Sequence, residues 1–186
     1  MLYRGSGPGP LETKFCGLAG GLALKDGAEI AGYASLFGAA DQGGDVVQTG
    51  AYGASLGRLA KAGSGVKMLW QHDPTRPIGV WDEVREDGRG LWVKGRLILE
   101  VQAAREAQAL LQAGAIDGLS IGYRTLRSEK AAGGRRLLHE IELWEVSLVT
   151  FPMLPEARVQ ADPSDAEADL ARTLAESFRE AREMLA

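Results

Sequence analysis

The sequence predicts a β-rich α+β domain, either a sheet or a barrel, with a helix at its C-terminal end. Most segments with regular patterning have the period of strands, and only two or three have the period of helices. Short polar turns between the strand-like segments permit antiparallel pairing. A doubly wound parallel fold would need a more regular alternation of strands and helices than this chain has.

The composition is that of an ordinary globular chain. Its 186 residues fit one domain plus a tail, and 45% are hydrophobic and 25% charged. The formal net charge of −4 gives no electrostatic reason to expect binding to nucleic acid or to an anionic membrane. No stretch approaches the ~20 apolar residues of a membrane span, and the N-terminus lacks the apolar core of a signal peptide. We therefore expect the chain to stay in the cytoplasm of the cell that makes it.

The first third of the chain predicts a leader, a strand and a helix. Residues 1–27 are rich in Gly and Pro and indicate a flexible leader with one short strand around Thr13–Leu18. Cys16 in this leader is the only cysteine, so no intrachain disulfide is possible. Glu29–Phe37 alternates as a strand does, and Leu56 and Leu59 have helical spacing within Tyr52–Ala62.

The middle of the chain predicts a strand, a hairpin and a helix. The short apolar run Val66–Trp70 leads directly into Gln71-His72-Asp73-Pro74. Ile78–Val84 and Leu91–Leu99 indicate a hairpin, because a polar turn, REDGRG, joins them. Glu100–Ala113 consists largely of strong helix formers, and Gly114 stands where a C-terminal cap is expected.

Two strands and a helix complete the prediction. The segment LSIGYRTL alternates Leu119, Ile121 and Tyr123 against Ser120, Gly122 and Arg124. Arg135–Phe151 indicates a long strand. One of its faces is predicted to carry His139, Ile141, Leu143, Glu145, Ser147 and Val149. A capping box at Ser164–Glu167 begins the terminal helix. The expected division is a leader (1–27), a main domain (28–160) and an amphipathic helix (161–186).

The residue types that could carry chemistry leave few classes of site. The chain has two histidines and no cysteine cluster, so it cannot supply a structural zinc site by itself. It has no P-loop, no dinucleotide fingerprint and no HExxH motif. A hydroxyl nucleophile with a histidine base remains, and no metal or cofactor is implied.

Ser120 is the candidate nucleophile because Gly118–Gly122 matches the pattern G-x-S-x-G. The elements around this serine differ from those in an α/β-hydrolase, in which a helix follows the serine and the catalytic histidine comes last in the sequence. Here a helix precedes the serine, a strand follows it, and the candidate base, His72, comes first. Pro74 biases Asp73 away from helix, which places His72 at the edge between a strand and a loop.

Glu145 is the first candidate for a third member of the site. An acid between Trp144 and Val146 is costly to bury without a partner, and an imidazolium would be such a partner. His139 lies six residues earlier, roughly 20 Å along a strand at ~3.3 Å per residue. Only one of Glu145 and His139 can therefore contact His72. A solvated position at a strand edge is the alternative for Glu145.

Four segments resemble the signature blocks of a known family, the tailed-phage prohead proteases. They occur in the expected order and cover most of residues 29–157: AGYASLFGAADQGGDVVQTGAY, LWQHD, DGLSIGYR and ELWEVSLVTFPMLPEA. This family is similar to the herpesvirus maturational proteases, the assemblins, whose triad is His, Ser and a second His.

The resemblance implies a small closed or nearly closed β-barrel flanked by helices, which forms a homodimer. It implies Ser120 as nucleophile, His72 as base and Glu145 in the place of the second histidine. Glu142 and His139 remain alternatives for that third position. Backbone N–H groups within Thr150–Leu154 are the expected oxyanion hole.

The function implied is that of a serine endopeptidase of procapsid maturation, acting inside assembling procapsids in the cytoplasm of a bacterial host. Its substrates would be the major capsid protein, any scaffold and the protease itself. The short chain suits a small phage or a gene transfer agent. A non-catalytic assembly or scaffold-binding module of the same fold is the alternative.

Overall fold

The computed structural model describes residues 2–4, 12–13, 28–154, 157 and 159. The predicted terminal helix and Cys16 lie outside the described residues. Within the leader, two short strands are described, both paired with the same long strand, β8. The division into leader, main domain and terminal helix stays a prediction.

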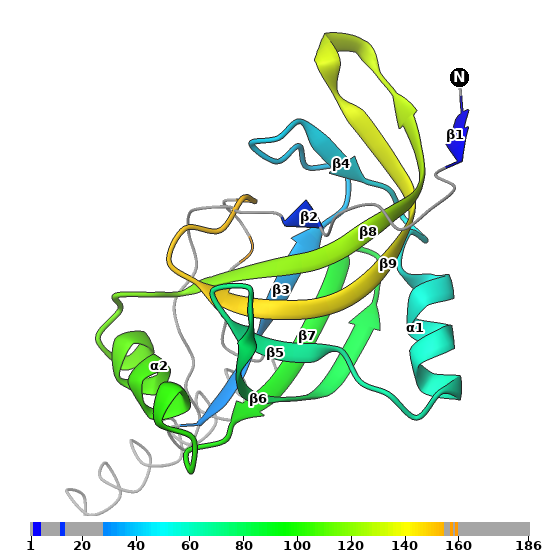
Figure 1. Ribbon diagram of the computed structural model, residues 1–186. Coiled ribbons are helices and arrows are strands. Elements are labelled where there is room, and N and C mark those ends of the chain that lie inside the picture. The colour runs from blue at the N-terminus through cyan, green and yellow to red at the C-terminus, as the bar shows by residue number, and fades with distance from the viewer. Residues whose placement is uncertain (1, 5–11, 14–27, 155–156, 158, 160–186) are drawn as a thin grey trace, which may run out of the picture.

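One curved sheet dominates the part of the chain that is described, and it contains nine strands (Figure 1). Their order is β1-β8-β9-β5-β6-β7-β3, with β2 added to β8 and β4 added to β9. The strands are β1 (Leu2–Arg4), β2 (Glu12–Thr13), β3 (Glu29–Leu36), β4 (Asp45–Val47), β5 (Lys67–Trp70), β6 (Asp73–Glu86), β7 (Gly90–Leu97), β8 (Gly118–Lys130) and β9 (Arg136–Val149). All neighbours pair antiparallel except β4 and β5, which run parallel to β9.

The sheet curls until its far strands meet, so the predicted nearly closed barrel is confirmed. β3 contacts β8 although the two strands are not paired. Residues 157 and 159 lie in the remaining gap: Val159 bridges Gly32 on β3, and its N–H donates to the carbonyl of Asp117 just before β8. The N–H of Leu119 donates to the carbonyl of Ala157.

The predicted alternation of β8 is confirmed by the core. Leu119, Ile121 and Tyr123 are at most 1% exposed and belong to the central apolar cluster. The matching residues of β9 are Ile141, Leu143, Val146 and Leu148. Ser120 and Gly122 therefore lie on the opposite face of β8, and this face carries the candidate site.

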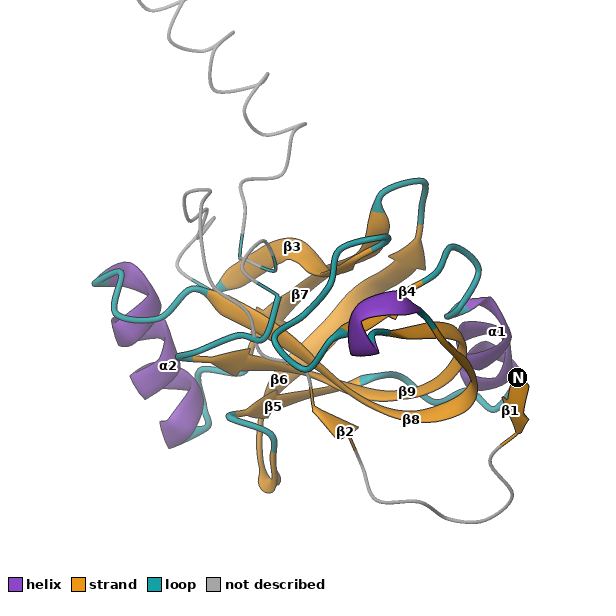
Figure 2. Cartoon of the chain, turned by 90° about the horizontal axis from the view of Figure 1, so that it is seen from above, coloured by secondary structure: helices purple, strands orange, loops and turns teal. Residues whose placement is uncertain are grey.

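Within the described residues, two α-helices lie at opposite ends of the sheet (Figures 1 and 2). They are α1 (Gly53–Lys61) and α2 (Gln102–Gln112), close to the predicted ranges. After α2, Gly114 has φ of +67° and its N–H donates to the carbonyl of Leu111. The N–H of Ala115 donates to the carbonyl of Leu110, which completes a Schellman cap at the predicted glycine.

Some strand boundaries differ from the prediction. β6 begins at Asp73, not Ile78, so it follows β5 after only two residues. β4 was not predicted: it is a short parallel partner of β9 within a polar, glycine-rich segment. β8 and β9 extend together to the turn at Ala132–Gly134, and this end of the hairpin projects from the barrel (Figure 1).

Candidate active site

Ser120 lies within β8, on the strand face that points away from the core, and is 1% exposed. The two glycines of its motif are required by close packing. A Cβ on Gly118 would meet the ring of Pro152 at 2.5 Å, and a Cβ on Gly122 would overlap the carboxylate of Glu145. Both contacts are shorter than Cβ atoms tolerate, so the glycines allow the neighbouring strand and loop to approach the serine.

His72 occupies the tight turn between β5 and β6. Trp70 pairs with Asp73, so Gln71 and His72 are the two turn residues, with φ of +53° and +62°. Two-residue hairpin turns with positive φ at both positions favour Asn and Gly, because a side chain in this region costs about 1–2 kcal/mol. The strained backbone aims the imidazole back over the sheet, and such strain is found mainly at functional positions.

Glu145 lies on β9, on the opposite face to the one predicted. The sequence placed it with Ile141 and Leu143, but these two side chains enter the core and Glu145 does not. The cause is a β-bulge: Gly122 pairs with Glu145 and Tyr123 pairs with Leu143, so Trp144 is an extra residue. One extra residue reverses the alternation, and Glu145 and Ser147 therefore share the face that carries Ser120.

The structure brings Ser120, His72 and Glu145 into one chain of contacts. His72 Nε2 lies 2.8 Å from Ser120 Oγ, and His72 Nδ1 lies 2.6 Å from Glu145 Oε1. A carboxylate beside Nδ1 favours the tautomer with its proton on Nδ1, which directs the Nε2 lone pair at the serine hydroxyl. The side chains of His72 and Glu145 are only 10% and 9% exposed, so little water screens their interaction.

The turn that carries His72 is fastened to the end of β9. The N–H of Gln71 donates to the carbonyl of Leu148 at 2.9 Å, and its side-chain amide donates to Thr150 Oγ1 at 2.7 Å. The N–H of Thr150 donates back to Gln71 Oε1 at 3.3 Å. These contacts were not predicted, because no pattern in the sequence relates Gln71 to Thr150.

Ser147 is a further polar residue of the site that the sequence did not single out. Its hydroxyl donates to Glu145 Oε2 at 2.6 Å and accepts the backbone N–H of His72 at 3.1 Å. Both oxygens of the buried carboxylate therefore have a hydrogen-bond partner, as a buried charge requires. The available signal was its position, two residues after Glu145 on the same strand face.

The two alternatives for the third position lie elsewhere. Glu142 Oε2 is 3.4 Å from the guanidinium of Arg124, and His139 Nε2 is 3.5 Å from a carboxylate oxygen of Glu129. His139 stands beside Leu138, which pairs with Ser128, eight residues along β8 from Ser120. At ~3.3 Å per residue this separation is roughly 25 Å.

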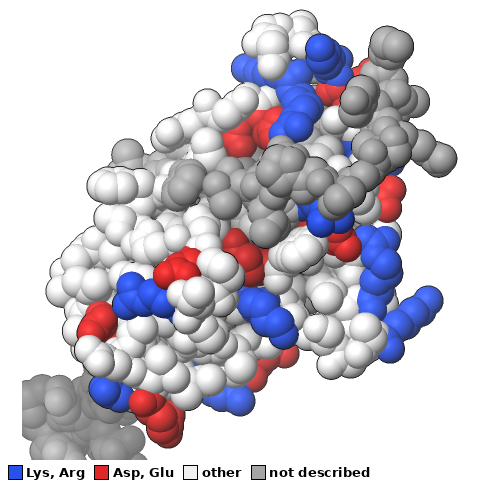
Figure 3. All heavy atoms as spheres, in the orientation of Figure 1, with Lys and Arg blue, Asp and Glu red and all other residues white. Residues whose placement is uncertain are grey.

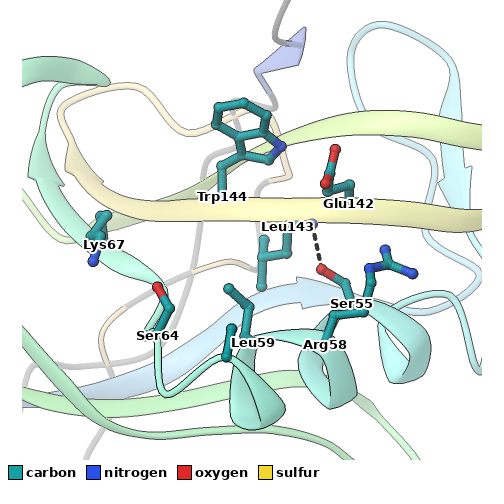
Figure 4. Close-up of a pocket in the computed structure, with 10 residues that line it drawn as sticks. Ser55, Arg58, Leu59, Ser64, Lys67, Glu142, Leu143 and Trp144 are labelled. Atoms are coloured by element: carbon teal, nitrogen blue, oxygen red, sulfur yellow. Dashed lines mark hydrogen bonds between the residues drawn. The ribbon is translucent and has the colours of Figure 1, made fainter. Parts of the chain in front are cut away.

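A pocket of about 210 Å³ opens beside His72 and Glu145. Leu69, Pro74 and Trp144 give it a largely apolar wall, and Lys67 lies at its side. Lys67 and Trp144 also border a second hollow, of about 350 Å³, between α1 and β9 (Figure 4). In Figure 4 Leu143 points towards α1, whereas Glu142 and Trp144 point to the other side of β9.

The segment predicted to supply the oxyanion hole, Thr150–Leu154, passes close to the serine motif, because Pro152 packs against Gly118. Within Thr150–Leu154, Pro152 has no N–H, and the N–H of Thr150 is bonded to Gln71. The oxyanion hole in this segment stays a prediction, with the N–H groups of Phe151, Met153 and Leu154 as its candidates.

Three further observations concern the surface, possible metal ligands and the helices of the described residues. Basic and acidic side chains are mixed over the face shown in Figure 3. The described residues contain no group of three or more His, Cys, Asp or Glu side chains that could hold a metal ion. Within the same residues, no helix is both long enough and apolar enough to cross a membrane.

Comparison with known proteins identifies the family. The model of the family described as Caudovirus prohead serine protease matches residues 22–171, which is most of the chain. The chain belongs to this family. The Caudovirus prohead serine proteases are thus the group whose signature blocks the sequence resembles, and that recognition is confirmed.

Two viral relatives match parts of the chain. The prohead protease of Enterobacteria phage HK97 is 32% identical over 133 residues, which cover 70% of this chain and 58% of that protein. The chain thus spans little more than half the length of this relative. The capsid polyprotein of Pseudomonas phage PAJU2 is 31% identical over 102 residues, 50% of this chain and 15% of the polyprotein.

One solved structure has a fold similar to that of this chain. The capsid assembly protease of bacteriophage T4 superposes with a TM-score of 0.56 at 14% identity, over 75% of this chain and 96% of that one. At this identity the likeness concerns the fold alone. The varicella-zoster virus protease covers 71% of this chain with a TM-score of 0.40 at 12% identity, which is too weak for any argument.

Proposed function

We propose that this chain is a serine endopeptidase in which Ser120 is the nucleophile, His72 the general base and Glu145 the group that orients the base. One observation carries the proposal: Ser120 Oγ, the imidazole of His72 and the Glu145 carboxylate lie in series, with contacts of 2.8 and 2.6 Å. A hydroxyl, an imidazole and a carboxylate in this order are the catalytic groups that serine proteases use for nucleophilic acyl transfer.

The reaction follows from the proton positions. Ser120 Oγ attacks the carbonyl carbon of the scissile peptide while its proton passes to His72 Nε2. The imidazolium gives this proton to the leaving amine as the C–N bond breaks, and Ser120 is left acylated. Water, deprotonated by the same imidazole, then releases the acid and restores the hydroxyl. Glu145, 2.6 Å from Nδ1, stabilises the positive ring in both steps.

The proposed substrates are proteins of the assembling capsid: the major capsid protein, any scaffold and the protease itself. The family supports this proposal, and so does the match of this chain to part of a protein named capsid polyprotein. We further propose that the enzyme acts inside procapsids in an infected bacterial cell. A homodimer is the proposed active form, and light scattering of the purified chain measures it.

A fluorophosphonate probe tests the proposed nucleophile, because it phosphonylates an activated serine hydroxyl with loss of fluoride. The wild-type full-length chain, measured alone and with procapsids, should be labelled, and Ser120→Ala should not. Ser128→Ala is the matched control, since Ser128 is another buried serine of β8, near its far end. Labelling of Ser120→Ala equal to that of wild type would reject Ser120 as the nucleophile. No labelling of wild type, either alone or with procapsids, would favour a non-catalytic assembly module. Cleavage of the capsid protein of the same virus then tests the substrate.

A further inference from the structure

Ser147 contacts both His72 and Glu145, the other two members of the proposed triad. It lies on β9, is fully buried and pairs with Ser120 on one side and Leu69 of β5 on the other. Its hydroxyl donates to Glu145 Oε2 at 2.6 Å. The same oxygen accepts the backbone N–H of His72 at 3.1 Å. One side chain therefore contacts the carboxylate and the backbone that carries the imidazole.

The contact with Glu145 fixes the direction of the carboxylate. Glu145 uses Oε1 for His72 Nδ1, at 2.6 Å. A carboxylate bonded through one oxygen can still swing about its terminal torsion, which is broad in glutamate. Ser147 holds the second oxygen, so the plane of the carboxylate and the lone pair offered to Nδ1 are both set.

The contact with His72 acts on a strained backbone. His72 has φ of +62°, a region in which a side chain is disfavoured, so its turn needs external contacts to persist. The N–H of His72 donates to the hydroxyl of Ser147. A small shift of this N–H moves the whole imidazole relative to Ser120.

We propose that Ser147 is a positioning residue of this site, which sets the mutual geometry of Glu145 and His72 through a single hydroxyl. The inference rests on the proposed function, since it concerns how the proposed triad is held. Ser147 does not contact the reacting atoms in this proposal. It determines how often the imidazole is in line between Ser120 and Glu145.

Another serine provides a matched control. Ser55 of α1 is 2% exposed, and its hydroxyl accepts the backbone N–H of Leu143, also on β9, at 2.9 Å (Figure 4). Each of the two serines is buried and accepts a hydrogen bond from a backbone N–H, and in each bond one partner lies on β9. Only Ser147 contacts members of the proposed triad. A purely structural role predicts the same result for Ser55→Ala and Ser147→Ala.

The experiment measures fluorophosphonate labelling of the full-length chain over a range of probe concentrations. It yields the maximal labelling rate constant and the probe concentration at half-maximal rate. For Ser147→Ala we expect the maximal rate to fall about 10- to 100-fold, as it does for other residues that hydrogen-bond to a functional group and orient it. The probe concentration at half-maximal rate should stay within about twofold of the wild-type value. Ser55→Ala should lower the melting temperature and leave the labelling rate near wild type.

The division of the effect between these two parameters is a readout that a purely structural role would not produce. Loss of the Ser147 hydroxyl removes a donor to Glu145 Oε2 and an acceptor for the N–H of His72. Ser147 does not line the pocket beside His72, so the variant changes the geometry of the proposed triad and keeps the lining of that pocket.

Ser147→Cys guards against a folding defect, because it fills the same space with a weak donor and acceptor. It should slow labelling in the same direction as Ser147→Ala. A wild-type maximal labelling rate in Ser147→Cys, or equal slowing in Ser55→Ala, would overturn the inference. The proposed function fails separately, through labelling that survives Ser120→Ala.

Discussion

The carboxylate of Glu145 occupies the space in which a side chain on residue 122 would lie. Gly122 and Glu145 pair across β8 and β9, next to the bulge at Trp144. Gly122, the second glycine of the serine motif, thus leaves the space that the Glu145 carboxylate needs to reach His72. This relationship leads directly to a test of the site.

Gly122→Ala should abolish most of the activity without unfolding the chain. The added methyl group overlaps the Glu145 carboxylate, so the carboxylate must leave His72 or β9 must move. Fluorophosphonate labelling should fall at least 100-fold, and the free energy of unfolding should fall by about 1–3 kcal/mol from overpacking.

Gly57→Ala is the control for this substitution. Gly57 lies in α1, and a Cβ there meets no atom within 4 Å. Labelling should stay at the wild-type rate, while stability rises by roughly 0.5–1 kcal/mol because alanine replaces glycine in a helix. A Gly122→Ala chain labelled as fast as wild type would show that the observed position of Glu145 is unnecessary.

Glu145→Gln should lower the labelling rate by about 10³- to 10⁴-fold, because an amide no longer holds the required imidazole tautomer or stabilises its positive form. The fold should survive, since glutamine keeps the volume of the side chain. The comparison is with Glu142→Gln and His139→Ala, whose side chains lie near Arg124 and Glu129. Both of these variants should be labelled within about threefold of wild type. A large loss in either one, with Glu145→Gln active, would move the third position.

Trp144→Ala should weaken the binding of substrate more than it slows the chemistry. Trp144 forms part of the apolar wall of the pocket beside His72, is 41% exposed and has the Arg124 guanidinium 5.1 Å from its ring centroid. With a peptide from the cleaved capsid protein, KM should rise about tenfold and kcat should change less than threefold.

Ile98→Ala controls for the loss of an exposed apolar side chain, because Ile98 is 37% exposed and does not line that pocket. Its KM should equal that of wild type. If Trp144→Ala lowers kcat and leaves KM unchanged, the pocket does not bind the substrate, and the effect passes through the neighbouring Glu145.

The sequence predicted those features that follow from local patterns. The helix before Gly114 could be predicted because strong helix formers, an apolar stripe and a capping glycine agree with one another. The alternation of Leu119 and Ile121 against Ser120 was visible for the same reason: β8 is regular there, and one of its faces is buried.

The features that the sequence did not predict depend on contacts between distant segments. The bulge at Trp144 reverses the faces of β9, yet nothing in its residue types distinguishes it from a regular strand. The turn at Gln71 and His72 lacks the Asn and Gly that mark such turns, because the contacts with Thr150 and Ser147 stabilise it. The candidate triad was chosen from residue types and family resemblance, and its third position stays a prediction, with Glu145 as the candidate in contact with His72.

Asp87 provides a prediction about stability that is independent of the candidate site. It lies in the turn between β6 and β7. Partial burial by itself would raise the pKa of its carboxyl, but hydrogen bonds from the N–H groups of Arg89 and Gly90 and from the side chains of Tyr33 and Arg85 lower the pKa to about 2. The ordinary value is 3.8. The folded state therefore favours the ionised carboxylate.

The sign of the pH dependence follows. A carboxyl whose pKa is lower in the folded chain contributes stability that is present above its unfolded value, 3.8, and is lost as the pH falls through about 2. Asp87→Asn should thus reduce the free energy of unfolding by roughly 1 kcal/mol at pH 7. The effect is smaller than the full change in pKa would give, because the side chain is 23% exposed and water screens its interactions. The difference between wild type and variant should shrink from pH 4 to pH 2.

Urea unfolding at pH 7, 4 and 2 measures this difference. Asp82→Asn is the control, because Asp82 is an exposed carboxylate of the same hairpin, paired with Arg96, and its side chain is 47% exposed. Labelling of Ser120 should be unchanged in both variants at pH 7. A destabilisation by Asp87→Asn that is the same at all three pH values would show that the charge of Asp87 contributes nothing, and that the hairpin depends only on the shape of this side chain.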